Sequence, residues 1–172
     1  ANELFANAND NCYRDGTQTY IQSKWDEADG RFSIWNDGSA MSAHDVSKAM
    51  GDFHAGSNFD TSETGKKECV YTSGRNGVGA KGANVFGDEF VAVVKNAAEG
   101  LAGKAVWREQ MDVAVPLKIS AYKGAVNETR IEWKPAFATF AISSCQLPPF
   151  HTSITVSFAI CAPLSNISCQ TM

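Results

Sequence analysis

Alternating apolar and polar positions predict strands over most of the second half of the chain. The alternation recurs in four segments, at 89–95, 104–111, 115–123 and 129–133. Because successive side chains of a strand point to opposite faces, each segment can turn one apolar face toward a core. We therefore expect the second half to be mostly sheet.

The first half combines helices with a hairpin. The pattern predicts, in order, a helix at 3–11, strands at 17–25 and 31–35, and a short helix at 43–50. Asp29-Gly30 is a tight-turn pair and separates the two strands. The second strand runs into Asn36-Asp37-Gly38, a turn signal from which a loop can present polar groups to a ligand.

Polar residues recur with helical spacing in the first predicted helix. Glu3, Asn7, Asp10 and Asn11 stand at i, i+4, i+7 and i+8, so on a helix they share one face. From spacing alone, the default interpretation is a solvated surface.

A polar, glycine-rich stretch at 51–82 separates the two halves. A stretch this long without apolar periodicity is typical of a lid or a binding loop. Its end, 74–82, runs into Ala83-Asn84-Val85-Phe86, where we expect a helix to open. The loop therefore suggests phosphate binding.

Three phosphate-binding schemes fit this loop to different degrees. Gly77, Gly79 and Gly82 have the dinucleotide spacing but do not follow the first strand of a βαβ unit. Gly74 and Gly79 have P-loop spacing, but Ala80-Lys81-Gly82 follows where Lys and then Ser or Thr are required. A lid whose backbone N–H groups, with a helix N-terminus, cradle a triphosphate fits best.

Composition and charge narrow the class of protein. The chain has 172 residues, 44% of them hydrophobic and 20% charged, which suits one ordinary domain with a sizeable core. Its net charge of −4 argues against a broad DNA-gripping surface. Five cysteines without zinc-like spacing indicate reduced thiols inside a cell. No segment has the length and apolarity of a membrane span, so we expect an intracellular, soluble protein without membrane contact.

The last part of the chain differs from the rest. From Pro135 to Met172 there is no Asp, Glu, Lys or Arg, and three of the five cysteines lie there. A strand around 154–160 is one interpretation of this tail, and a segment foreign to the fold is the other.

Taken together, the polar helix face, the Asn-Asp-Gly turn and the glycine-rich loop resemble conserved sequence boxes of the GHKL ATPase superfamily. Within it, they resemble the ATPase domains of eukaryote-like and viral type II DNA topoisomerases. Residues 3–11 are similar to that family's first box, 34–38 to its second, and 74–81 with 84–86 to its third. Residues 57–60 are similar to that family's ribose- and phosphate-contacting segment, and residues 129–135 are similar to the strand near the end of its domain. The resemblance covers residues 2 to about 140. The chain departs from the family's pattern at Ala40 and Ser73, where the family usually has glycine.

The resemblance implies ATP and Mg²⁺ as cofactors and assigns a role to each site residue. Glu3 would be the general base for water, Asn7 the Mg²⁺ ligand, and Asn36 the residue that binds the adenine amino group. Asn11 would lie near the phosphates. The remaining expected nucleotide contacts are Ser57, Asn58, Arg75, Asn76, Gly77, Val78, Gly79, Ala80 and Lys81.

These observations predict an α/β two-layer sandwich, a mixed β-sheet with helices on one face. Residues 1–140 would form the ATP-binding domain, incomplete at its N-terminus, and 141–172 an unassigned tail. The family's dimerising arm and the domain that supplies a γ-phosphate lysine would lie outside the chain, so we expect poor hydrolysis by this chain alone. The complete enzyme would be a homodimer that contacts DNA through other parts. Another GHKL ATPase and a non-catalytic nucleotide- or partner-binding domain are the alternatives.

Overall fold

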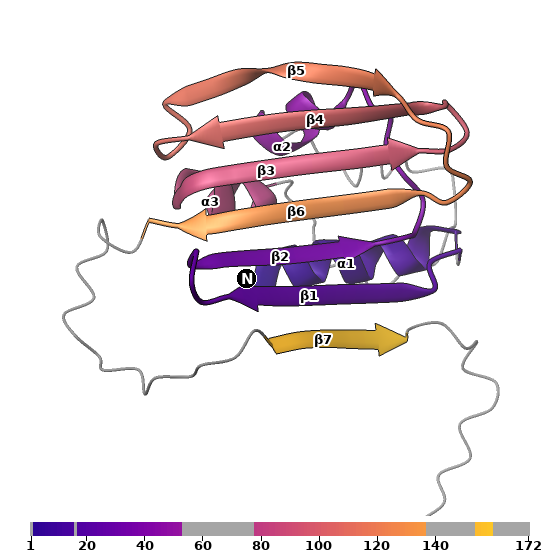
Figure 1. Ribbon diagram of the computed structural model, residues 1–172, viewed down its shortest axis with the longest axis horizontal. Coiled ribbons are helices and arrows are strands. Elements are labelled where there is room, and N and C mark those ends of the chain that lie inside the picture. The colour runs from indigo at the N-terminus through magenta and orange to yellow at the C-terminus, as the bar shows by residue number, and fades with distance from the viewer. Residues whose placement is uncertain (1, 16, 53–77, 137–153, 160–172) are drawn as a thin grey trace, which may run out of the picture.

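The protein folds as one sheet with helices on a single face (Figure 1). The computed structural model describes residues 2–15, 17–52, 78–136 and 154–159. Its elements are α1 (Asn2–Asp15), β1 (Tyr20–Asp26), β2 (Arg31–Asn36), α2 (Val46–Gly51), α3 (Gly79–Val85), β3 (Gly87–Asn96), β4 (Leu101–Arg108), β5 (Val113–Ala121), β6 (Glu128–Pro135) and β7 (Ile154–Ala159). The two-layer α/β architecture is confirmed.

The sheet is antiparallel rather than mixed, which corrects the expectation. The strand order is β5-β4-β3-β6-β2-β1-β7, and each of the six described pairings is antiparallel. The chain passes from β2 through helices to β3, a connection that leaves these two strands pointing the same way. They are not neighbours, however, because β6 lies between them and pairs antiparallel with both. The crossover therefore creates no parallel pair.

Most elements lie where the pattern predicts them. The hairpin at Asp29-Gly30 is confirmed, with Gly30 at a φ of 63°, a conformation that favours glycine. The four strands of the second half are also confirmed. The expectation that a helix begins at Ala83 is wrong, because α3 already begins at Gly79. Of the two interpretations of the tail, the structure shows the strand, as β7 paired with β1.

The helices pack on the apolar face of the sheet through alternating residues. Phe90, Ala92 and Val94 of β3 are fully buried beneath the helices, and Leu4 and Ala8 of α1 belong to the same core cluster. Burial of a large apolar side chain of this kind stabilises the fold by roughly 1.5–3 kcal/mol. The core therefore holds α1 against the sheet.

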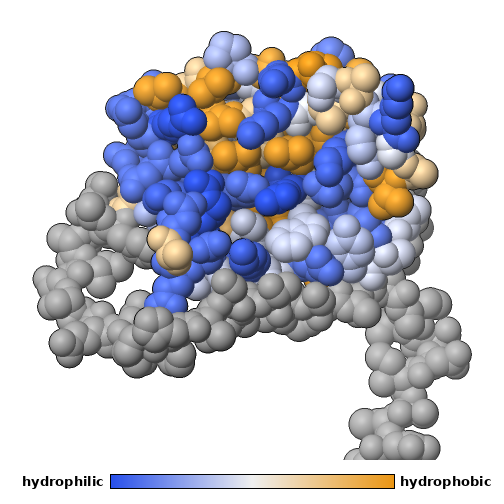
Figure 2. Space-filling view, viewed as in Figure 1, coloured by the Kyte–Doolittle hydropathy of each residue, from blue (hydrophilic) through white to orange (hydrophobic). Residues whose placement is uncertain are grey.

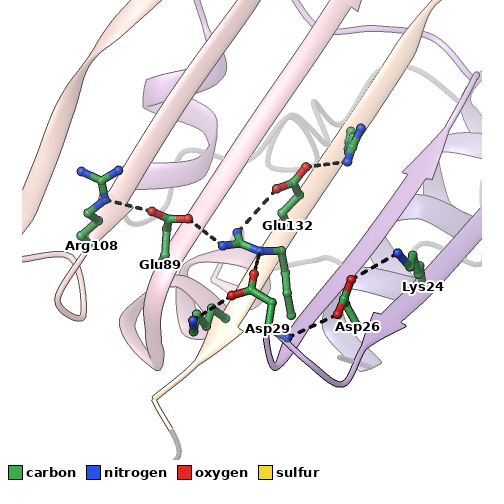
Figure 3. Close-up of polar contacts among 9 residues, drawn as sticks. Lys24, Asp26, Asp29, Glu89, Arg108 and Glu132 are labelled. Carbon is green, nitrogen blue, oxygen red and sulfur yellow. Dashed lines mark hydrogen bonds and ion pairs between the residues drawn. The ribbon is translucent and has the colours of Figure 1, made fainter. Parts of the chain in front are cut away.

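The opposite, open face of the sheet is partly apolar and partly charged. Figure 2 views this face and shows apolar surface over the β3–β5 side, where Val113 and Val115 are exposed. The surface over β6, β2 and β1 is mostly polar. Charged side chains from four neighbouring strands meet near one end of the face (Figure 3).

Arg31 is the centre of this charged cluster. Its guanidinium contacts Asp29 at 2.6 Å, Glu89 of β3 at 3.0 Å and Glu132 of β6 at 3.5 Å. Glu89 also accepts a hydrogen bond from Arg108 of β4 at 2.9 Å. That bond is the main reason the pKa of Glu89 is lowered; burial opposes it, and the bond from Arg31 adds to it. The cluster links β4, β3, β6 and β2.

Removal of the Arg31 guanidinium should destabilise the fold. Arg31→Met leaves three carboxylates without their shared partner, and we expect a loss of roughly 1–2 kcal/mol at pH 7, between the values for exposed and buried ion pairs. Because the folded-state pKa of Glu89 is lowered, this contribution is complete above the ordinary carboxylate pKa of about 4 and disappears as the pH falls through the folded-state value. Urea unfolding at pH 7 and at pH 3 measures both effects.

Lys24→Met is the matched control, since Lys24 forms a more exposed pair, with Asp26. It should have a clearly smaller effect. Equal losses for both variants, or a loss for Arg31→Met that does not change with pH, would contradict the role given to Arg31.

Candidate functional site

The polar face of α1 divides into an exposed half and a buried half. Glu3 and Asn7 are exposed, whereas Asp10 and Asn11 are buried. A simple solvated surface therefore explains only the first half. The buried half lies where α1 approaches the end of β2.

Asn11 and Asn36 form the centre of a buried amide network. Nδ2 of Asn11 donates to Oδ1 of Asn36 at 2.9 Å and to the carbonyl oxygen of Ser39 at 3.1 Å. The backbone N–H of Gly38 also donates to Oδ1 of Asn36, at 3.3 Å, and Oγ of Ser39 donates to Oδ1 of Asn11 at 3.1 Å. The backbone groups of Gly38 and Ser39 fix the orientation of both amides, because either flip would place two donors or two acceptors face to face.

Gly38 is required in this network by close packing. A Cβ at this position would stand 2.5 Å from Nδ2 of Asn11 and 2.9 Å from Oε1 of Gln18. Real Cβ atoms do not approach other atoms this closely. The glycine of the Asn-Asp-Gly turn thus makes room for two buried amide side chains.

Asp37 anchors the neighbouring segment rather than facing the amide network. Its Oδ1 accepts hydrogen bonds from the backbone N–H groups of Thr19 at 2.9 Å and Tyr20 at 3.0 Å, and its Oδ2 accepts one from the Thr19 hydroxyl. Burial alone would raise the pKa of Asp37, but these hydrogen bonds outweigh it and lower the pKa. Asp37 therefore holds the start of β1 against the end of β2.

The start of α1 lies against the start of α3. The carboxylate Oε2 of Glu3 occupies the space that a Cβ on Gly79 would need, and Cδ and Cβ of Glu3 lie 3.2 and 3.3 Å from that point. The predicted general base and the predicted phosphate loop thus meet, although they are distant in sequence. The predicted lid residues differ in exposure: Val78 is exposed, whereas Ala80 and Lys81 are buried.

Lys81 stands out because it is a lysine with only 3% of its surface exposed. Burial lowers the pKa of Lys81, and the carboxylate of Asp52 opposes this shift. Five further predicted contacts, Ser57, Asn58, Arg75, Asn76 and Gly77, lie outside the described residues. Within the described ranges, no group of three or more His, Cys, Asp or Glu side chains could hold a metal ion.

Sequence reasoning missed Gln18 and Ser39. Ser39 follows a recognised turn, so its contact with Asn11 could have been considered. Gln18 sits in a segment whose alternation indicates only a strand, and nothing in the sequence marks it as buried beside Asn11 and Gly38. Such a placement depends on how α1 packs across the ends of β1 and β2.

The chain is similar in sequence to several DNA topoisomerases. It is 31% identical over 149 residues to DNA topoisomerase 2 of Penicillium chrysogenum, covering 82% of this chain and 9% of that protein. It is 30% identical over 150 residues to human DNA topoisomerase 2-alpha, covering 83% and 9%. The chain thus spans about a tenth of the length of the curated relatives it matches. No protein-family model matches it.

Solved structures agree with these sequence relatives. The ATPase region of Saccharomyces cerevisiae topoisomerase II matches with a TM-score of 0.73 and 25% identity, over 83% of this chain and 38% of that one. The ATPase and transducer domains of DNA topoisomerase II from Balamuthia mandrillaris match with a TM-score of 0.71 and 27% identity, over 80% and 36%.

Fold and comparisons together define a class of protein: the ATPase regions of type II DNA topoisomerases. Within this class, the sequence relatives are eukaryotic enzymes named DNA topoisomerase 2, of which the chain matches about a tenth of the length. The resemblance noted from the sequence is confirmed. No helix among the described residues is long and apolar enough to cross a membrane.

A methyl group at Gly38 should disturb the amide network. Gly38→Ala forces Asn11 or Gln18 to move in a buried site, and overpacking of this kind typically destabilises a protein by roughly 1–3 kcal/mol. Gly82→Ala is the matched control, because a Cβ there meets nothing within 4 Å and alanine favours a helix. Thermal unfolding should show a loss for the first variant and none for the second. Equal stability of both variants would refute the packing argument.

Proposed function

We propose that this chain is the ATPase module of a type II DNA topoisomerase, which binds Mg-ATP and, together with other parts of the enzyme, hydrolyses it. The observation that supports the proposal best is the position of α1. One end of its polar face lies against Gly79, through Glu3, and the other end is bonded to Asn36, through Asn11. Asn11 stands eight positions after Glu3 on the helix, a rise of about 12 Å. An extended nucleoside triphosphate can reach along this face from its base to its terminal phosphate.

The base would lie at the Asn36 end of this face. Asn36 has only 4% of its surface exposed and stands at the end of β2, where the backbone of Gly38 fixes its amide. A buried amide held in this way can distinguish a base by hydrogen bonding, because an unmatched base would leave a polar group unsatisfied. We therefore assign the adenine amino group to Asn36.

The phosphates and Mg²⁺ would lie toward the Glu3 end. Asn7 is exposed midway between Glu3 and Asn11, and its amide oxygen is a hard ligand of the kind that Mg²⁺ accepts while keeping several waters. When bound, Mg²⁺ would neutralise charge on the phosphate oxygens. Arg75 to Lys81 would wrap the phosphates, with Ser57 and Asn58 at the ribose or phosphates.

Glu3 would act on water rather than on the nucleotide. An exposed carboxylate beside the start of α3 can accept a proton from a water molecule and hold that water in line with the terminal phosphorus. Phosphoryl transfer depends mainly on such positioning. Glu3 would thus orient the water molecule that attacks the terminal phosphate.

Gate closure and DNA strand passage are proposed only for a protein longer than this chain. In the family, ATP binding is expected to close a dimeric gate around a DNA segment that is then passed through a double-strand break. The net charge of −4 is consistent with DNA contacts outside this chain. We accordingly propose a homodimeric, intracellular enzyme whose DNA-binding parts lie elsewhere.

Calorimetry with Mg-ATP tests the proposal directly. The protein should bind ATP saturably, more tightly with Mg²⁺ than without. Asn36→Ala should weaken binding by roughly 1–3 kcal/mol, because the base then lacks its partner. Asn9→Ala, on α1 but off its polar face, should change affinity little. Thermal unfolding of each variant separates loss of binding from loss of fold. Absence of ATP binding by the folded wild-type protein would overturn the proposal.

Hydrolysis should be much weaker than binding. The family's γ-phosphate lysine belongs to a following domain, and one missing charge-stabilising group commonly lowers the rate by roughly 100- to 1,000-fold. Phosphate release by this chain should therefore stay near background at saturating Mg-ATP. Glu3→Gln should change it little here and reduce it sharply in a protein that also carries the following domain. Brisk turnover by this chain alone would show that another group replaces the lysine.

A further inference from the structure

The side-chain amide of Gln18 is buried, with only 1% of the residue's surface exposed. Among the residues that the structure describes, neither its Oε1 nor its Nε2 has a hydrogen-bond partner. Buried amides are nearly always bonded, because desolvation without compensation is unfavourable. A group kept in this state is a candidate for a partner that arrives later.

The amide of Gln18 lies beside the Asn11–Asn36 network. Its Oε1 and Nδ2 of Asn11 are both within 3 Å of one point, the position that a Cβ of Gly38 would occupy. No side chain separates them there, because residue 38 is a glycine. Rotation of the two amides toward each other would join this donor to this acceptor.

Asn36 has no free acceptor capacity for a base. An amide oxygen has two lone pairs, and Oδ1 of Asn36 already accepts from Nδ2 of Asn11 and from the backbone N–H of Gly38. An incoming amino group must therefore displace one donor. The Gly38 N–H belongs to the turn backbone, whereas the Asn11 amide belongs to a side chain and is the easier group to move.

We propose that Gln18 is a positioning residue that accepts this displaced hydrogen bond. When the amino group of a 6-aminopurine nucleotide donates to Oδ1 of Asn36, Nδ2 of Asn11 turns to Oε1 of Gln18 and keeps its bond to Ser39. This exchange gives the displaced donor a new partner and supplies Oε1 of Gln18 with a donor. The inference rests on the proposed role of Asn36 in binding adenine.

The exchange predicts an effect confined to nucleotides with the amino group. Without the Gln18 amide, the displaced N–H of Asn11 would stay unpaired, and affinity for ATP should fall about tenfold. Purine riboside triphosphate lacks the exocyclic amino group and displaces nothing. Its affinity should be unchanged.

The test uses Gln18→Met, which keeps the length of the side chain and removes the amide. Calorimetry compares ATP with purine riboside triphosphate, both with Mg²⁺, for the wild-type protein and the variant. Gln22→Met is the matched control: Gln22 lies on β1 beside Ile21, on the opposite face of the sheet, and pairs with Trp35. Thermal unfolding of the nucleotide-free proteins gives a second readout. Gln18→Met should be at least as stable as wild type, because it removes an unsatisfied buried amide.

The expected result is a selective loss of ATP affinity in Gln18→Met, with an undiminished melting temperature and no change in Gln22→Met. Equal losses for both nucleotides would assign Gln18 to packing and overturn the exchange. Unchanged ATP affinity would overturn it as well. Failure of the wild-type protein to bind either nucleotide would instead refute the proposed function, and with it the premise of the exchange.

Discussion

The hydrogen bonds of Asn11 to Asn36 and Ser39 join α1 to the end of β2 and the turn after it, and the geometry of the candidate site depends on them. Apolar burial of Leu4 and Ala8 presses the helix onto the sheet but leaves its lengthwise position loosely defined. A directional contact between two buried amides defines that position. With the far end of α1 fixed, Glu3 necessarily falls beside Gly79 at the near end.

The two faces of the sheet carry different kinds of side chains. The helix-covered face carries the core and the buried amides, whereas the open face carries the Arg31 cluster and the valines of β5 (Figures 2 and 3). Charges on the open face link four strands without entering the core. The strand β2, which carries Asn36, is thereby linked to β6 and β3 from the side that the nucleotide would not occupy.

Local patterns in the sequence predicted the helices and strands well. They predicted little of how distant elements are placed relative to one another. The hairpin follows from alternation and Asp29-Gly30, which specify it within a few residues. The start of α3 was missed because glycines at 77, 79 and 82 are typical of a loop, whereas packing of Ala80 in the core stabilises a helix there. The mixed sheet was wrong because no local signal shows that β6 inserts between β2 and β3. The pairing of Asn11 with Asn36 is likewise tertiary; the family resemblance supplied both residues, but not their mutual bond.

The pairing of β7 with β1 also matters for the fate of the chain before it finishes folding. β1 would otherwise be an edge strand, with a row of backbone groups ready to pair with another molecule. Because β7 lies far from β1 in the sequence, this contact closes a very long loop and is expected to form late in folding. Until then, the β1–β2 hairpin exposes an edge on which aggregation can begin. The strand β7 thus acts as a late shield for β1.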